Sequence, residues 1–158
     1  MDDPVERRLL QLRPDVGRRI VTLSLMIRSH YYRGLLVLLR RDRIIDVREK
    51  ELMLKIGEIL DFDRRFCEAT IDELMSNAHI TRDPVLFRDE NIRQCFFRDA
   101  LRVALVDGKL HPSERRWLRS VARANGKTSR WLDALIREFR EKKDAWAPNA
   151  PLEIQQYM

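Results

Sequence analysis

The sequence predicts an all-α protein, a compact helical bundle of two similar three-helix halves with internal pseudo-twofold symmetry. Apolar residues recur at three- and four-residue spacing in six segments, which is the pattern of amphipathic helices. Glycine and proline are scarce, at five and six of 158 residues, so few positions interrupt a helix. The stretch IRSHYYRGLLVLLRRD at 27–42 returns as IRQCFFRDALRVALVD at 92–107, which indicates a duplication.

The repeat continues beyond these two stretches. Residues 27–74 align with residues 92–139 without a gap, at an offset of 65 residues. The identical pairs are Ile27/Ile92, Arg28/Arg93, Arg33/Arg98, Leu36/Leu101, Asp42/Asp107, Glu49/Glu114, Arg65/Arg130, Ala69/Ala134, Ile71/Ile136 and Glu73/Glu138. Substituted pairs keep size and apolarity, as in Tyr31/Phe96, Tyr32/Phe97, Met53/Leu118, Ile56/Val121 and Phe66/Trp131. Apolar positions shared by two copies of a unit predict a shared core.

The first helix of each copy contains the aromatic pair and is predicted to run to Asp42 or to Asp107. In the first copy, residues 15–26 are expected to extend this helix toward the N-terminus. Adjacent aromatic side chains point in different directions along a helix. Core packing is the expectation for both members of each pair, and a groove lined by one member is the alternative.

The second and third helices each carry one apolar stripe. In the second helix the stripes are Leu52, Met53, Ile56 and Leu60, and Trp117, Leu118, Val121 and Ala122. In the third they are Phe66, Cys67, Thr70, Ile71 and Leu74, and Trp131, Leu132, Leu135, Ile136 and Phe139. Spacings of this kind fall on a single face of a 3.6-residue helix, so these residues are predicted to be buried.

The turn VDGKLHPSE predicts where one helix ends and the next begins. Gly108 occupies a position where helices often end in a left-handed residue. His111 is then the N-cap, Pro112 the first helical residue and Glu114 the third, where it can bond back to the N-cap amide. The first copy offers the better N-cap residue Asp46, with Glu49 in the place of Glu114.

The linker 77–88 contains the turn signal Asp83-Pro84. We therefore expect one domain over residues 1–145 and a C-terminal tail at 146–158. The tail is expected to be flexible or docked. Its candidate anchors are Trp146, Leu152, Ile154 and Tyr157.

Composition limits the classes of function. The apolar run IVTLSLMI is too short for a bilayer, and the N-terminus lacks a signal-peptide pattern, so cytoplasmic localisation is expected. Cys67 and Cys95 have no CxxC spacing and are predicted to be buried thiols rather than disulfide or zinc ligands. The net charge of +6 favours anionic partners, but acidic residues interrupt the basic ones along most helices.

The stretch ALRVALVDGKLHPSERRWLRSVARANG resembles the signature of the TerB-like tellurite-resistance family, whose fold also occurs in a DnaJ-like co-chaperone domain. The matching residues are Asp107, Gly108, Leu110, Glu114, Leu118 and Val121, and the first copy lacks the glycine. The resemblance covers about residues 15–142 and implies a compact helical bundle with pseudo-symmetry. It also implies a non-catalytic stress-response module that works through a protein partner, in some members beside a membrane.

The same resemblance implies a divalent cation (Ca, Mg, Mn or Zn) held by Asp42, Glu49, Asp107 and Glu114. From the residues alone, helix capping and turn stabilisation are the alternative for these carboxylates. An EF-hand is excluded, because Val103 and Leu105 stand where its first carboxylates would be.

The histidines and a row of arginines bear on two further classes of function. His30, His79 and His111 accompany no nucleophile–base spacing, so the protein is not expected to be an enzyme. Arg115, Arg119 and Arg123 follow one another at four-residue spacing. They favour, as the alternative function, a basic helical module that contacts nucleic acid or an anionic membrane surface.

Overall fold

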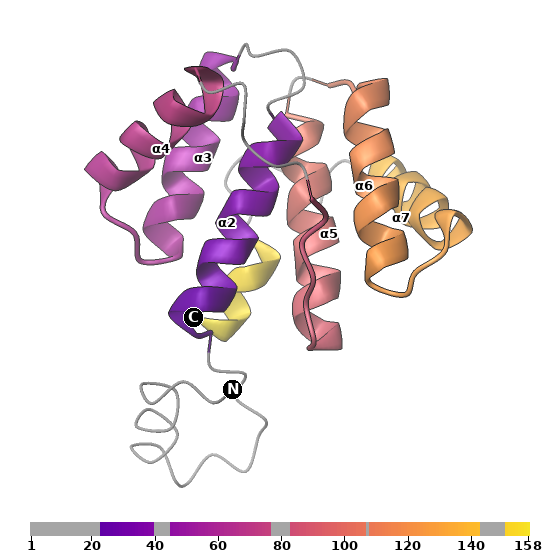
Figure 1. Ribbon diagram of the computed structural model, residues 1–158. Helices are drawn as coiled ribbons and strands as arrows, with labels where there is room; N and C mark the ends of the chain where they lie inside the picture. The colour runs from indigo at the N-terminus through magenta and orange to yellow at the C-terminus, as the bar shows by residue number, and fades with distance from the viewer. Residues whose placement is uncertain (1–22, 40–44, 77–82, 107, 143–150) are drawn as a thin grey trace, which may run out of the picture.

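The computed structural model describes residues 23–39, 45–76, 83–106, 108–142 and 151–158. Within these ranges the chain forms six α-helices, one short 3-10 helix and no strand, which confirms the all-α prediction. The elements are α2 (Leu25–Leu39), α3 (Val47–Ile59), α4 (Arg64–Ser76), α5 (Glu90–Ala104), α6 (Pro112–Ala124), α7 (Ser129–Glu141) and η3 (Glu153–Tyr157). In Figure 1, α2 and α5 stand side by side at the centre, with α3 and α4 on one side and α6 and α7 on the other.

The two three-helix groups reproduce the sequence repeat. Helices α5, α6 and α7 begin and end 65 residues after α2, α3 and α4, respectively. The turns also correspond. Asp61, after α3, has φ 65°, and Gly126, after α6, has φ 77°. An aspartate held in the left-handed region at the position of a glycine shows that the repeated turn imposes this backbone geometry on both copies.

Helices α2 and α5 meet through the aromatic pairs. Tyr31, Tyr32, Phe96 and Phe97 are all buried, which confirms core packing for both members of each pair. The rings of Tyr31 and Phe96 meet edge to face, with centroids 5.3 Å apart and planes at 89°, a favoured aromatic arrangement.

Two contacts at this interface are formed by equivalent pairs of positions in the two copies. The Tyr31 hydroxyl donates to the carboxylate of Asp99 at 2.6 Å. The Phe96 ring lies directly against Gly34, so that a Cβ on this glycine would be 2.8 Å from the ring. Phe96 is the repeat equivalent of Tyr31, and Gly34 is the equivalent of Asp99. The pair of contacts is therefore what a pseudo-twofold axis between α2 and α5 produces.

The start of α2 differs from the sequence prediction. The Ile27 amide donates to Ser24 Oγ at 3.2 Å, and α2 begins at Leu25. The predicted helical extension is therefore wrong for Leu23 and Ser24, because the serine caps the helix there. The rest of 15–26 that precedes Leu23 lies outside the described residues.

The helix ends also differ from the prediction. Helix α5 ends at Ala104, short of the predicted Asp107, and the Gly108 amide donates to the Leu105 carbonyl at 2.9 Å. Gly108 has φ 87°, as its predicted helix-end role requires.

The apolar stripe of α4 is narrower than predicted. Cys67, Ile71 and Leu74 are buried, but Phe66 is 53% exposed and Thr70 is half-buried. This helix packs mainly on α3, so only residues spaced by three or four positions face the core. His30, which the sequence placed in a partly buried aromatic stretch, is exposed on α2.

The linker reaches α5 as an extended segment that crosses in front of that helix in Figure 1. Asn125, at the end of α6, fixes it through two hydrogen bonds. Its Oδ1 accepts from the Phe87 amide at 2.9 Å, and its Nδ2 donates to the Val85 carbonyl at 2.8 Å. Val85 and Phe87 are buried beside the aromatic pairs, so the linker is part of the core.

Among the described residues, no helix has the length and apolar character needed to span a bilayer.

The Gly34 contact can be tested directly. Gly34→Ala should destabilise the protein by about 1–3 kcal/mol, because the new Cβ would be forced into the Phe96 ring. Urea denaturation measures the change. Gly34→Ala should cost less in a Phe96→Leu background than in the wild type, because the ring that meets the new Cβ is then absent. Ser29→Ala, on the exposed face of α2, should change stability by less than about 0.5 kcal/mol. Equal effects of the Gly34 and Ser29 substitutions would contradict the close α2–α5 packing.

Candidate binding surfaces

The predicted acidic turns are helix caps where the structure describes them. Glu49 Oε1 accepts from the Asp46 amide at 3.3 Å, and Glu114 Oε1 accepts from the His111 amide at 3.0 Å. Both glutamates are buried, at 3% and 1% exposed. Asp46 Oδ1 accepts from the Arg48 amide at 2.7 Å, and the Asp46 side chain also pairs with the backbone of Glu49, which completes the capping box in the first copy. The capping geometry predicted for both turns is confirmed.

The other two predicted metal ligands, Asp42 and Asp107, lie outside the described residues, as does His79. Over the described ranges, no three His, Cys, Asp or Glu side chains gather closely enough to hold a metal ion. Cation binding by the four predicted carboxylates stays a prediction.

The predicted basic residues on α6 have different surroundings. Arg123 is exposed, whereas Arg115 and Arg119 are half-buried. The Arg119 guanidinium lies 3.9 Å from the Asp133 carboxylate of α7. The three residues therefore do not form one uniform strip. Arg116 is also exposed on α6, and the other exposed basic side chains of this half on α7 are Arg130, Arg137 and Arg140.

At three equivalent exposed positions, an acidic residue of the first half is replaced by an arginine in the second half. The three acidic residues are Glu51, Glu58 and Asp72, and their equivalents are Arg116, Arg123 and Arg137. Residues 23–76 contain ten basic and ten acidic residues, whereas residues 88–141 contain 13 and 8. The net positive charge of the protein is thus concentrated on the half formed by α5, α6 and α7.

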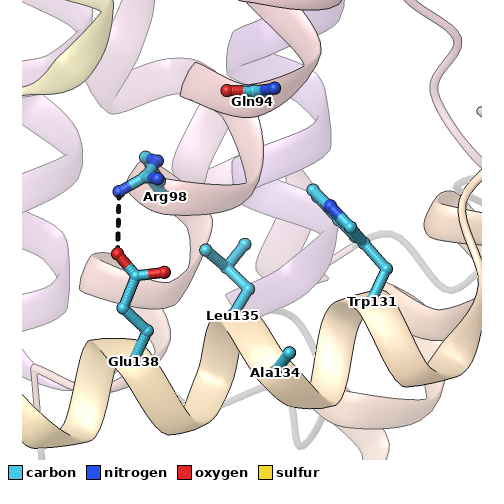
Figure 2. A pocket seen from close by; sticks show the side chains of 6 residues that line it. All are labelled: Gln94, Arg98, Trp131, Ala134, Leu135 and Glu138. Atoms are coloured by element: carbon cyan, nitrogen blue, oxygen red, sulfur yellow. Dashed lines mark ion pairs between the residues drawn. The ribbon is translucent and has the colours of Figure 1, made fainter.

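A shallow groove separates α5 from α7 on this basic half. Figure 2 shows Arg98 pointing toward Glu138, with 3.9 Å between their charged atoms, and Trp131 at the other end. The lining residues are Gln94, Arg98, Trp131, Ala134, Leu135 and Glu138, and the volume is about 190 Å³. This is smaller than the pockets that usually hold cofactors or drug-sized ligands, so the groove suits a single side chain.

A second surface is occupied by the C-terminal segment, residues 151–158. Leu152 and Ile154 are buried against the body of the protein. Asp99 of α5, 1% exposed, accepts hydrogen bonds from the Glu153 amide at 2.9 Å and the Ile154 amide at 3.2 Å. Of the four predicted anchors, Leu152 and Ile154 are buried, Tyr157 is half-buried and Trp146 lies outside the described residues. The sequence did not predict the role of Asp99. The signal that could have found it is the alignment of this aspartate with Gly34.

Burial dominates the electrostatics of this second surface. It raises the pKa of Asp99 to about 6, although the hydrogen bonds from Tyr31 and the two amides act in the opposite direction. Burial, with the nearby Asp99 charge, also raises the pKa of the Cys95 thiol to about 12, so this cysteine stays protonated. The same loss of water lowers the pKa of Arg102.

Comparison of the chain with models of protein families, with curated proteins and with solved structures found no match. The TerB-like resemblance around residues 100–126 therefore stays a prediction.

The capping role of Glu114 predicts a specific stability difference. Glu114→Ala removes the acceptor for the His111 amide and should cost about 1–2 kcal/mol, whereas Glu114→Gln keeps a carbonyl acceptor and should cost less. Thermal denaturation with EDTA measures both. A cation site would give a different result, because millimolar Ca²⁺, Mg²⁺, Mn²⁺ or Zn²⁺ would then raise the melting temperature of the wild type but not of Glu114→Gln.

The buried Asp99 predicts a pH dependence of stability. Its native pKa of about 6 exceeds the ordinary value of 3.8, so the native state binds this proton more tightly than the unfolded state does. The stabilisation is complete below about pH 4 and is lost as the pH rises through 6, a change of about 3 kcal/mol. Urea denaturation between these limits should show the decline in the wild type and a flatter profile in Asp99→Asn. Parallel profiles would contradict this assignment.

Proposed function

We propose that this protein is a non-catalytic binding module whose basic outer face, on α6 and α7, docks an acidic region of a partner protein. The observation that carries the proposal is the concentration of positive charge on the second half, where arginines replace acidic residues of the first half at three exposed positions. The basic face is defined by Arg116 and Arg123 on α6 and Arg130 and Arg137 on α7, all exposed.

The reversal concerns the surface and not the fold. Core positions keep their apolar character between the copies, as Met53 and Ile56 do with Leu118 and Val121. The reversed positions are exposed in both halves, where substitutions usually change stability little. A cluster of one charge sign that the fold does not require is a reasonable basis for an electrostatic binding site.

The groove of Figure 2 adds an apolar element to this face. Arg130 and Arg137 stand one helical turn before and after Ala134, which lines the groove on α7. The indole of Trp131 forms part of the same lining. Protein interfaces commonly combine a buried apolar anchor with a charged rim. We therefore expect the partner to place one apolar side chain in the groove and carboxylates around it.

The arrangement favours a protein partner over nucleic acid or lipid. Glu141 is exposed on α7, and Asp133 and Glu138 are half-buried there, so negative charges interrupt the arginines. A continuous phosphate backbone would meet these carboxylates, whereas spaced acidic side chains can avoid them. The proposal agrees with the binding role and protein partner that the TerB-like resemblance implies. The cation is not part of it.

Charge reversal tests the proposal. Arg116→Glu combined with Arg123→Glu should weaken the binding of poly-L-glutamate, used as a probe for an acidic segment, by about tenfold or more, because attraction becomes repulsion. The matched control reverses the equivalent positions, with Glu51→Arg and Glu58→Arg, and should retain or strengthen binding. Fluorescence anisotropy with increasing NaCl measures both.

Duplex DNA and phosphatidylserine vesicles serve as alternative probes in the same assay. Binding to either, with no binding of poly-L-glutamate at low salt, would replace the acidic protein with nucleic acid or membrane as the partner. No salt-dependent binding of any probe would contradict a functional role for the basic face.

A further inference from the structure

Residues 151–158 bind to the body of the protein as a short peptide would. The Asp99 carboxylate accepts from the amides of Glu153 and Ile154, and Arg102 Nη1 donates to the Pro151 carbonyl at 3.1 Å. All three contacts use backbone atoms of the segment. They fix its direction and register whatever its side chains are.

Two side chains of the segment add selectivity. Leu152 and Ile154 are 4% and 0% exposed, whereas their neighbour Gln155 and the terminal Met158 are exposed. We call the surface that residues 151–158 cover, with Asp99 and Arg102 of α5, the segment groove, which is distinct from the groove of Figure 2. This groove accepts two apolar residues two positions apart, and the amides of the second residue and of the one before it donate to Asp99. Burial of these two side chains stabilises the docked segment, and the cost of ordering the segment offsets part of that gain, so the contact can be reversible.

The floor of this groove is polar as well as apolar. Beside Asp99 and Arg102 lies the Tyr31 hydroxyl, and Cys95 Sγ lies 3.4 Å from the Gln156 side-chain amide. A carboxylate, a guanidinium and a phenol can all bind water when the segment leaves. Emptying the groove would therefore expose groups that water can satisfy, which makes the occupant easier to remove than part of a dry core.

The repeated fold does not require Asp99, because the equivalent position in the first half is Gly34. We infer that the groove is a peptide-binding site, and that the peptide it binds from outside is the C-terminal segment, residues 151–158, of a second copy of this chain. This segment is known from the structure to fit. Residues 151–158 of another molecule carry the same backbone groups and the same two apolar side chains. Two molecules could therefore swap these segments without forming any new type of contact.

The covalent connection explains why a chain would normally fill its own groove. Eight residues, 143–150, separate Lys142 from Pro151. A short tether of this kind gives the chain's own segment an effective concentration in the millimolar range. Exchange between copies therefore becomes dominant where the internal contact is blocked. The site does not involve the basic face on α6 and α7 and does not depend on the function proposed for it.

Complementation between two full-length variants tests the inference. Asp99→Asn damages the groove and keeps the segment, because its side-chain amide would meet the segment's own N–H donors. Ile154→Asp damages the segment and keeps the groove, because the buried site rejects the new charge. Each variant alone should sediment as an 18.9 kDa monomer. Mixed at about 0.1 mM, below the effective concentration of the tether, they should form a one-to-one dimer.

Controls make either outcome decisive. Amide exchange of residues 151–158 first establishes that the segment is undocked in each variant; where Asp99→Asn leaves it docked, Asp99→Asn with Arg102→Ala is used. Met158→Asp, at an exposed position of the segment, should remain monomeric with its segment docked. A mixture that stays monomeric with both segments undocked would overturn the inference. So would a dimer between either variant and a chain carrying both substitutions, since that pair lacks a matching groove and segment.

Discussion

The contact between α2 and α5 is the interaction on which the rest of this structure depends. The two helices carry the aromatic pairs, and the edge-to-face packing of Tyr31 on Phe96 brings the two halves together. Phe87 of the linker joins the same cluster, with its ring centroid 5.1 Å from that of Phe96. Because close-packed aromatic rings tolerate little change in spacing, α3 with α4 and α6 with α7 are carried into place on opposite sides of this pair.

Comparison of the two copies distinguishes the residues that the fold requires from the exposed residues that can differ between the halves. Each copy needs its apolar stripe, a buried glutamate that caps the second helix, and a left-handed residue between the second and third helices. The fold does not fix the residue type at exposed positions. At one of them, Glu58 of the first copy is replaced by Arg123 in the second. The result is a scaffold with nearly equivalent halves and electrostatically different outer faces. Differences between the halves are therefore the natural place to look for function.

The contact of Asp99 shows how a single change within the repeat can create a new surface. At Gly34 the absence of a side chain lets the Phe96 ring pack directly on the backbone. At the equivalent position a carboxylate meets the hydroxyl of Tyr31 and still has oxygen lone pairs to offer. A buried carboxylate is costly unless its hydrogen-bonding capacity is used, and the amides of Glu153 and Ile154 use it. The docked segment is thus the consequence of a buried charge that the repeat did not require.

The sequence by itself determined the helical class, the two matching halves, and the capping of the second helix in each copy. Those features depend on local spacing and on residue types a few positions apart, which a sequence displays directly. Tertiary structure decided which residues of a predicted stripe reach the core: Phe66 is 53% exposed, while its equivalent Trp131 is half-buried and meets the Phe97 ring. It also decided that Asp99 of α5 meets the amides of a segment more than 50 residues further on. Such a contact depends on how whole helices pack, and no local pattern in the chain encodes it.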